Sequence, residues 1–239
     1  MDKEQTENIR QNIEVILEKI EKSAKKAGRD PKDIRLIAVT KKKSAAIIKT
    51  LAEYGIKRIG ESYLNEALFK IDLLRDFQIE WHMIGTIQIG KEREIAARFA
   101  EVHSVGGTKT AINLNKFAKM NKRNLPIYLE LNISGEETKS GWNAWDEKNW
   151  KDLIPDLNEI QGLSNIGVKG LMTMAPYSKD PQMARPYFNR LRRLREYLSR
   201  EIPEACYEEL SMGMSGDFEV AIEEGATILR IGSALVGPR

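Results

Sequence analysis

The sequence has very little cysteine and histidine. Among its 239 residues there is one cysteine, Cys206, and there are two histidines. A single cysteine cannot form an intramolecular disulfide, which favours a reducing compartment and predicts a cytoplasmic location. Two histidines and one cysteine also supply few ligands for a structural zinc site, so we expect no metal.

Long apolar runs and a strong excess of one charge are also missing. No stretch reaches the roughly 20 apolar residues that span a bilayer, and residues 1–30 lack the apolar core of a signal peptide. The 38 basic and 35 acidic side chains give a net charge of only +3. We therefore expect neither a membrane nor a nucleic acid as a partner.

Patterns typical of buried strands alternate with helical patterns along the chain. Residues Lys3–Ala27 carry isoleucines at helical spacing, which predicts an amphipathic helix. Apolar runs then predict strands over residues 34–40, 58–61, 80–85, 101–105, 126–134, 166–174, 207–212 and 227–232. Parallel strands separated by helices, eight in a chain of this length, predict a (β/α)8 TIM barrel. A doubly wound sheet is the competing layout, but no G-x-G-x-x-G follows the first strand.

The expected organisation is one α/β domain over residues 1–239. Residues 1–30 would form an extra N-terminal helix packed on the barrel. The sequence contains no linker, low-complexity segment or clear internal repeat that would divide the chain.

Loops rich in small residues follow the last two predicted strands. One reads SMGMSGD over residues 211–217, and the other contains Gly232 and Ser233. In (β/α)8 barrels these loops often hold phosphate. Small residues ahead of a helix leave backbone N–H groups open to an anion. The same residues also serve as ordinary turns and caps, but two such loops at this end of a barrel predict an anion site.

Lys41 ends the first predicted strand, at the same face as these loops. A lysine forms a Schiff base with a carbonyl when neighbouring cations, here Lys42 and Lys43, keep part of its amine neutral. A carbonyl together with a phosphate is the outline of pyridoxal 5'-phosphate (PLP).

Arg230 lies inside the apolar eighth strand and is the candidate partner of the cofactor's ring nitrogen. The alternative is an arginine paired with a carboxylate at the barrel wall. Because arginine stays protonated, it would face an unprotonated ring nitrogen, which weakens the cofactor as an electron sink. Arg230 therefore disfavours broad carbanion chemistry and favours racemase-like or non-catalytic use.

Seven stretches of the sequence resemble one known family, in the same order. They are LIAVTKKKSAAII, IGESYLNEA, WHMIGTIQIGK, VHSVGG, LELNISGEETKSGW, VKGLMTM and ELSMGMSGDFEVAIEEGATILRIGSALVGPR. Over residues 34–239 they are similar to the pyridoxal phosphate homeostasis proteins, single-domain relatives of the alanine racemase N-terminal barrel. The resemblance implies a PLP-binding protein that carries or regulates intracellular PLP, influences vitamin B6 and amino-acid balance, and has little or no catalytic activity. The expected partners are PLP and PLP-dependent apoenzymes, and we expect a monomer.

The resemblance also implies the residues of the cofactor site. It assigns the Schiff base to Lys41 and the contact with the ring nitrogen to Arg230. The other expected contacts line the pocket or hold the phosphate: Ser62, His82, Met172, Ser211, Met212, Gly213, Met214, Ser215, Gly232 and Ser233. Ser62, Ile89 and Gly90 differ from the family's usual residues on the open side of the ring.

Two enzymatic functions remain open. A slow PLP-dependent amino-acid racemase needs a base opposite the lysine, for which Tyr63 and Tyr177 are candidates. Racemases of this lineage take that tyrosine from a second domain, and we expect no room for one before the sequence ends at Arg239. A class I aldolase would use Lys169, but this residue comes early in its predicted strand, toward the face opposite the active site.

Three tryptophans lie in the polar segment after the fifth predicted strand, at Trp142, Trp145 and Trp150. They either pack against the barrel rim or mark a partner surface. We favour packing, because tryptophans in a polar loop bury large apolar area against a neighbouring core.

Overall fold

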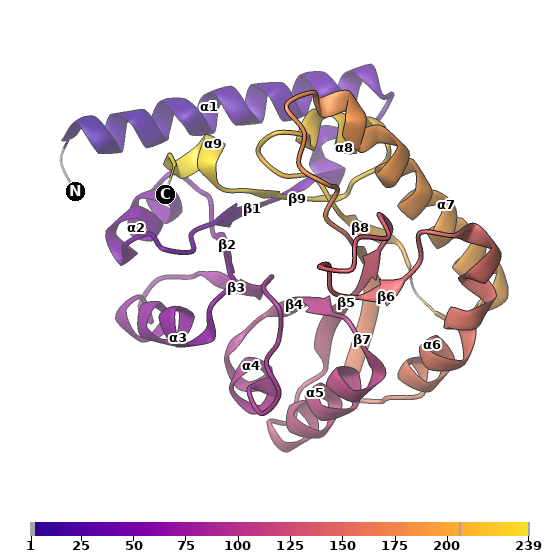
Figure 1. Ribbon diagram of the computed structural model, residues 1–239. Coiled ribbons are helices and arrows are strands. Elements are labelled where there is room, and N and C mark those ends of the chain that lie inside the picture. The colour runs from indigo at the N-terminus through magenta and orange to yellow at the C-terminus, as the bar shows by residue number, and fades with distance from the viewer. Residues whose placement is uncertain (1–2, 206, 239) are drawn as a thin grey trace.

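The computed structural model describes residues 3–205 and 207–238. Within these ranges, eight parallel strands form a closed barrel surrounded by helices (Figure 1). The barrel strands are β1 (Arg35–Val39), β2 (Arg58–Glu61), β3 (Glu80–Met83), β4 (Glu101–Val105), β5 (Leu125–Asn132), β7 (Ile166–Met172), β8 (Glu209–Ser211) and β9 (Ile228–Ile231). The predicted (β/α)8 barrel is confirmed, and each predicted strand is present with its ends shifted by at most two residues.

Parallel pairing runs around the whole barrel. The strands follow the order β4-β3-β2-β1-β9-β8-β7-β5, and pairing of β4 with β5 closes the circle. β1 lies between β2 and β9, with Ile37 opposite Arg230. Since all strands run in one direction, their C-terminal ends meet at one face, where the loops that follow β1, β2, β8 and β9 come together.

Helices follow the barrel strands and cover its outer surface (Figure 1). They are α2 (Ala45–Glu53), α3 (Leu64–Leu73), α4 (Glu92–Arg98), α5 (Thr108–Met120), α6 (Ile154–Gln161), α7 (Arg185–Glu201), α8 (Phe218–Glu223) and α9 (Ser233–Val236), with short 3-10 helices at Pro31–Asp33, Glu147–Leu153 and Pro181–Ala184. In α7 the buried residues Phe188, Leu191, Leu194 and Leu198 recur at helical spacing. No helix in the described part of the chain has the length and apolar composition needed to cross a membrane.

The N-terminal helix α1 (Lys3–Lys26) matches the predicted range 3–27 closely. Ile9, Ile13, Ile16 and Ile20 form its buried face, and α1 packs against α2, α8 and α9. Figure 1 shows α1 running along one side of the barrel, past α9 and α8. Burial of this isoleucine stripe holds the helix on the barrel, because removal of apolar area from water is the main stabilising term.

The segment after β5 contains a short strand that the sequence did not predict. β6 (Trp142–Asn143) pairs in parallel with β5, Leu131 lying opposite Trp142. Trp150 is buried and donates its indole N–H to Ala144 O at 3.0 Å, whereas Trp145 is 48% exposed. Trp142 is half-buried and donates to Asp156 at 2.8 Å. Two of the tryptophans thus pack into this segment, as we favoured, and the third lies at the surface.

Replacement of Ile16 by alanine tests the packing of α1. Ile16 is 3% exposed, and its truncation should reduce the free energy of unfolding by about 2–5 kcal/mol in urea denaturation. Leu17→Ala is the matched control, because Leu17 is 46% exposed and its loss should cost about 0.5 kcal/mol or less. Equal losses for the two variants would contradict the observed face of α1.

Candidate functional site

A cavity of about 430 Å³ opens at the C-terminal ends of β1 and β9. This volume lies in the range typical of small-molecule sites. Most of the predicted site residues line it: Lys41, Ser62, Met214, Ser215, Arg230, Gly232 and Ser233. Lys43, Asp217 and Tyr177 also line it, and Tyr177 is 91% exposed. The fold therefore brings the predicted lysine, the predicted arginine and both small-residue loops to one cavity.

The other predicted residues lie outside this lining. Met172 is buried in the barrel interior with Ile37, Tyr128 and Ile228. His82 and Ser211 belong to a polar cluster in the interior, and Met212 is part of the hydrophobic core. Gly213 joins the first small-residue loop to β9, because its carbonyl accepts the backbone N–H of Arg230. Its φ of +97° is a conformation that favours glycine.

Lys41 follows β1 in a turn, and the buried side chain of Lys70 forms a hydrogen bond with the backbone just before it. Lys70 of α3 is 3% exposed, and its Nζ donates to the backbone carbonyl of Thr40 at 2.8 Å. The same Nζ donates to Glu61 Oε1 at 2.8 Å, and Thr40 Oγ1 donates to that oxygen at 2.6 Å. Burial raises the pKa of Glu61, against the hydrogen bonds from Lys70 and Thr40 that lower it. The backbone before Lys41 is thus anchored to a buried ion pair.

The backbone after Lys41 is anchored by the same group of charges. Glu66 Oε1 accepts the N–H of Lys42 at 2.6 Å and an N–H of Lys70 at 2.6 Å. Lys42 has a φ of +63°, an uncommon conformation for a residue with a side chain. Lys70, Glu61 and Glu66 were not predicted from the sequence. Their only signal there is the four-residue spacing of Glu66 and Lys70, which is also typical of exposed helical pairs.

Arg230 is 4% exposed and is held by neutral acceptors. Its Nη1 donates to Ser211 O and Ser211 Oγ, both at 2.7 Å, and its Nη2 donates to Thr173 O at 2.8 Å. Among the described residues, no carboxylate lies within the 4.0 Å ion-pair distance of its guanidinium. Burial lowers the pKa of Arg230 to about 10, so the group remains cationic at neutral pH. The structure thus differs from the alternative of an arginine paired with a carboxylate at the wall.

Ser215 ties the two small-residue loops together. Its Oγ accepts the backbone N–H groups of Gly232 and Ala234, each at 3.2 Å. Asp217 Oδ1 accepts the N–H of Met214 at 2.6 Å and closes the first loop. Burial raises the pKa of Asp217, against the backbone hydrogen bond from Met214 and the charge of Arg230 that lower it. Backbone and hydroxyl groups of both loops therefore meet at one wall of the cavity.

A second cavity of about 630 Å³ adjoins the first and shares Lys41 and Ser62 with it. Lys91 and Glu130 add charges of opposite sign to its lining, and burial raises the pKa of Glu130. Lys169 is exposed on β7 and lines neither of these cavities, which removes the geometric basis for an aldolase.

The positions that depart from the resemblance fall on the same side. Ser62 lines both cavities, and Tyr63 lines the second. Ile89 is 82% exposed, and Gly90 has a φ of +87° in the turn before Lys91. Ser62 therefore changes the lining of both cavities, whereas Ile89 and Gly90 lie in the turn between Gln88 and Lys91, which line the second.

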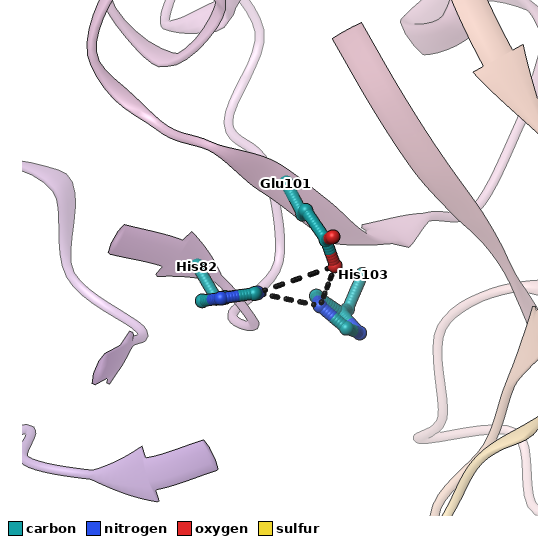
Figure 2. Close-up of side chains that lie close together, drawn as sticks. All are labelled: His82, Glu101 and His103. Atoms are coloured by element: carbon teal, nitrogen blue, oxygen red, sulfur yellow. Dashed lines mark hydrogen bonds and ion pairs between the residues drawn. The ribbon is translucent and has the colours of Figure 1, made fainter. Parts of the chain in front are cut away.

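The barrel interior below the cavities contains both histidines of the sequence. Figure 2 shows His82 of β3 beside Glu101 and His103 of β4. His82 Nδ1 lies 3.1 Å from His103 Nε2, and Glu101 Oε2 lies 3.4 Å and 3.5 Å from these nitrogens. Burial lowers the pKa of His103 to about 3, so its ring is neutral. The low histidine count gave no sign of this cluster, whose ligand atoms all lie within 4.8 Å.

Comparison with protein families and solved structures shows the class of protein to which this barrel belongs. Residues 5–239 match the family model for the alanine racemase N-terminal domain. An alanine racemase of Clostridium difficile shares the fold with a TM-score of 0.74 at 14% identity, over 98% of this chain and 60% of that chain. At this identity the likeness concerns the fold alone.

Two further proteins narrow the class. The chain is 39% identical over 232 residues to a pyridoxal phosphate homeostasis protein of Aquifex aeolicus, which covers 97% of this chain and 99% of that protein. It is also similar to the structure of PipY from Synechococcus elongatus PCC7942 with PLP bound, with a TM-score of 0.79 and 30% identity over 92% of this chain and 100% of that chain. The chain belongs to the family of pyridoxal phosphate homeostasis proteins.

Replacement of Lys70 by methionine tests the anchor beneath Lys41. The change leaves the buried Glu61 carboxylate without its cation and should reduce the free energy of unfolding by about 3–5 kcal/mol. Lys49→Met is the control, since Lys49 forms an exposed pair with Glu53 and should contribute under about 1 kcal/mol. A loss for Lys70→Met no larger than that of the control would refute the anchor.

The buried neutral ring of His103 predicts a pH dependence of stability. In the unfolded chain this ring gains a proton below about pH 6.5, whereas in the folded protein it does so only near pH 3. The unfolded state binds more protons in this window, so stability falls as the pH falls. Between about pH 7.5 and pH 5 the wild type should lose about 2 kcal/mol more than His103→Gln in urea unfolding. Equal losses would show that His103 does not titrate in this way.

Proposed function

We propose that the protein binds PLP in the first cavity and carries or regulates the cofactor inside the cell. Lys41 would hold the aldehyde as a Schiff base. The two small-residue loops, 211–215 with Met214 and Ser215 in the cavity lining, and Gly232 with Ser233, would hold the phosphate. Arg230 would face the ring nitrogen. The observation that carries the proposal is that Lys41, Arg230 and both small-residue loops line one cavity of about 430 Å³.

The cavity offers suitable partners for the phosphate and for the aldehyde of the cofactor. A phosphate needs several N–H and O–H donors, which two loops with Ser215 and Ser233 supply. An aldehyde needs an amine, and Lys41 offers one on a backbone that is anchored on both sides. Lys43 also lines the cavity, but its Nζ donates to Pro238 O at 2.6 Å, so it is the weaker candidate. PLP, when bound, supplies an electron sink for reactions at amino-acid carbons.

Arg230 favours use of the cofactor without substantial catalysis. A cationic guanidinium can only donate, so it keeps a facing pyridine nitrogen unprotonated and weakens the electron sink. A racemase would also need a fixed base, and Tyr177, the tyrosine in the cavity lining, is 91% exposed and has no hydrogen bond among the described residues. A slow amino-acid racemase is therefore the weaker candidate function.

The cofactor would be exchanged with other proteins in the cytoplasm. We propose PLP-dependent apoenzymes as partners and a monomer as the working form, because the site is built entirely from one chain. The low cysteine count supports the reducing compartment. The family name of the relatives supports a role in PLP homeostasis.

Borohydride reduction and peptide mapping of the protein after incubation with PLP test this proposal. We expect a pyridoxyl group on Lys41 in the wild type and none in Lys41→Ala, with the circular dichroism spectrum unchanged. Lys42→Asn is the matched control, because Lys42 lines neither described cavity and asparagine tolerates its φ of +63°. A pyridoxyl group on Lys43 or Lys91 instead would move the covalent site, and no adduct at any lysine would refute PLP binding by this cavity.

A further inference from the structure

A chain of hydrogen bonds leads from Arg230 into the barrel interior. Arg230 Nη1 lies 2.7 Å from Ser211 Oγ, and Ser211 Oγ lies 3.0 Å from His103 Nδ1. His103 Nε2 in turn lies 3.1 Å from His82 Nδ1 (Figure 2). The residues come from β9, β8, β4 and β3, so the chain crosses from one side of the barrel to the other. Arg230 alone among them lines the cofactor cavity.

The proton positions in this chain follow from what each group can do. Arg230 has only donors, so Ser211 Oγ accepts from it and has one O–H left to donate. His103 Nδ1 is the acceptor for that O–H, which leaves the ring proton on Nε2. Glu101 Oε2, 3.5 Å from Nε2, also favours a proton on this nitrogen. Both neighbours of His103 thus select the same tautomer.

The ring of His103 is also fixed in orientation. Tyr128 stacks on it with a centroid separation of 4.1 Å and an interplanar angle of 8°. Glu101 is itself held by Arg35 Nη1 at 3.2 Å and by the hydroxyl of Tyr128 at 3.1 Å. His103 is fully buried. The ring therefore has one position and one tautomer from which to direct the hydroxyl of Ser211.

The charges around the cluster favour a hydrogen-bonded chain over a bound metal ion. His82, Glu101 and His103 offer ligand atoms at a spacing that a metal could bridge. However, Glu101, the carboxylate of this cluster, is paired with Arg35, and the charge of Arg230 acts on His103 from the other side. The carboxylates near the cluster, Glu101, Glu209 and Glu80, are already paired with Arg35 or Arg58. A divalent cation would therefore add positive charge beside guanidinium groups that already neutralise these carboxylates, which is unfavourable.

We propose that His103 is a positioning residue for the cofactor site: it directs the hydroxyl of Ser211, which holds the guanidinium of Arg230 in place at the cavity. The inference rests on the proposed function, since it concerns the arginine that would face the cofactor. Loss of the imidazole frees the Ser211 hydroxyl to rotate and removes one fixed acceptor from the set that holds Arg230.

Absorption spectra and PLP titrations of His103→Phe, over a range of pH, test the assignment. Phenylalanine keeps the stacking on Tyr128 but has no nitrogen to accept from Ser211. We expect about tenfold weaker PLP binding and a pH profile of the bound cofactor's absorption that differs from the wild type. His103→Gln keeps an acceptor and a donor on one side chain and should restore part of both. A His103→Phe variant that matches the wild type in affinity and pH profile would overturn the inference.

Two further variants separate positioning from a loss of packing. Ser211→Ala should reproduce the spectral change of His103→Phe, and the double variant should add little, because both break the same chain. Ser211→Ala also carries the test if His103→Phe fails to fold. Leu114→Ala is the control: it truncates a fully buried side chain of α5, away from the hydrogen-bonded chain, and should lower stability while leaving the cofactor spectrum unchanged. Full additivity of the double variant, or the same spectral change in Leu114→Ala, would contradict the positioning role.

The outcomes distinguish this inference from the proposed function. If wild-type protein fails to bind PLP, the proposed function is wrong. If it binds PLP and the His103 and Ser211 variants bind it identically, the positioning role alone is wrong. Metal analysis of the purified protein completes the test: stoichiometric zinc in the wild type that is lost in His103→Phe would overturn the hydrogen-bonded chain in favour of a metal site.

Discussion

The parallel pairing of β1 with β9 is the constraint on which the site depends. It joins the first and last strands of the barrel and sets Ile37 opposite Arg230. Lys41 leaves β1 only a few residues beyond this pair, and the loop with Gly232 leaves β9 beside it. Residues nearly two hundred positions apart in the sequence thereby line one cavity. Without closure of the sheet, the lysine and the small-residue loops would lie at opposite edges.

Closure also forces polar groups into a buried space, and the two buried cations nearest the site are each held by several hydrogen bonds. Beneath Lys41 the Lys70 ammonium reaches two carboxylates and a carbonyl, so its desolvation is offset by close partners. Beneath the cavity Arg230 has no carboxylate among the described residues and relies on carbonyl and hydroxyl oxygens. These two clusters fix the two side chains to which we assign the cofactor, one from its backbone and the other from its guanidinium.

A barrel of the racemase type does not by itself imply racemase activity, because the reaction depends on the residues of the site and not on the fold. An alanine racemase shares the fold at 14% identity, but this chain spans 60% of that protein. Within the chain the cavity offers two lysines, an arginine, an aspartate and an exposed tyrosine. Such a set can hold a phosphorylated aldehyde, and its tyrosine is fixed by no hydrogen bond among the described residues. Binding of PLP is the function that this arrangement supports best.

The sequence by itself determined the barrel and the residues at the strand ends, because both depend on local patterns. Apolar runs and helical spacing are set by neighbouring residues, so the strands, α1 and the position of Lys41 could be predicted. Which residues face the cavity depended on strand tilt and depth, and only the tertiary structure placed His82 in the interior. The contacts of His103 with Ser211 and of Lys70 with Thr40 join residues 108 and 30 positions apart. No local pattern encodes such pairs, since the closed barrel alone brings them within hydrogen-bond distance.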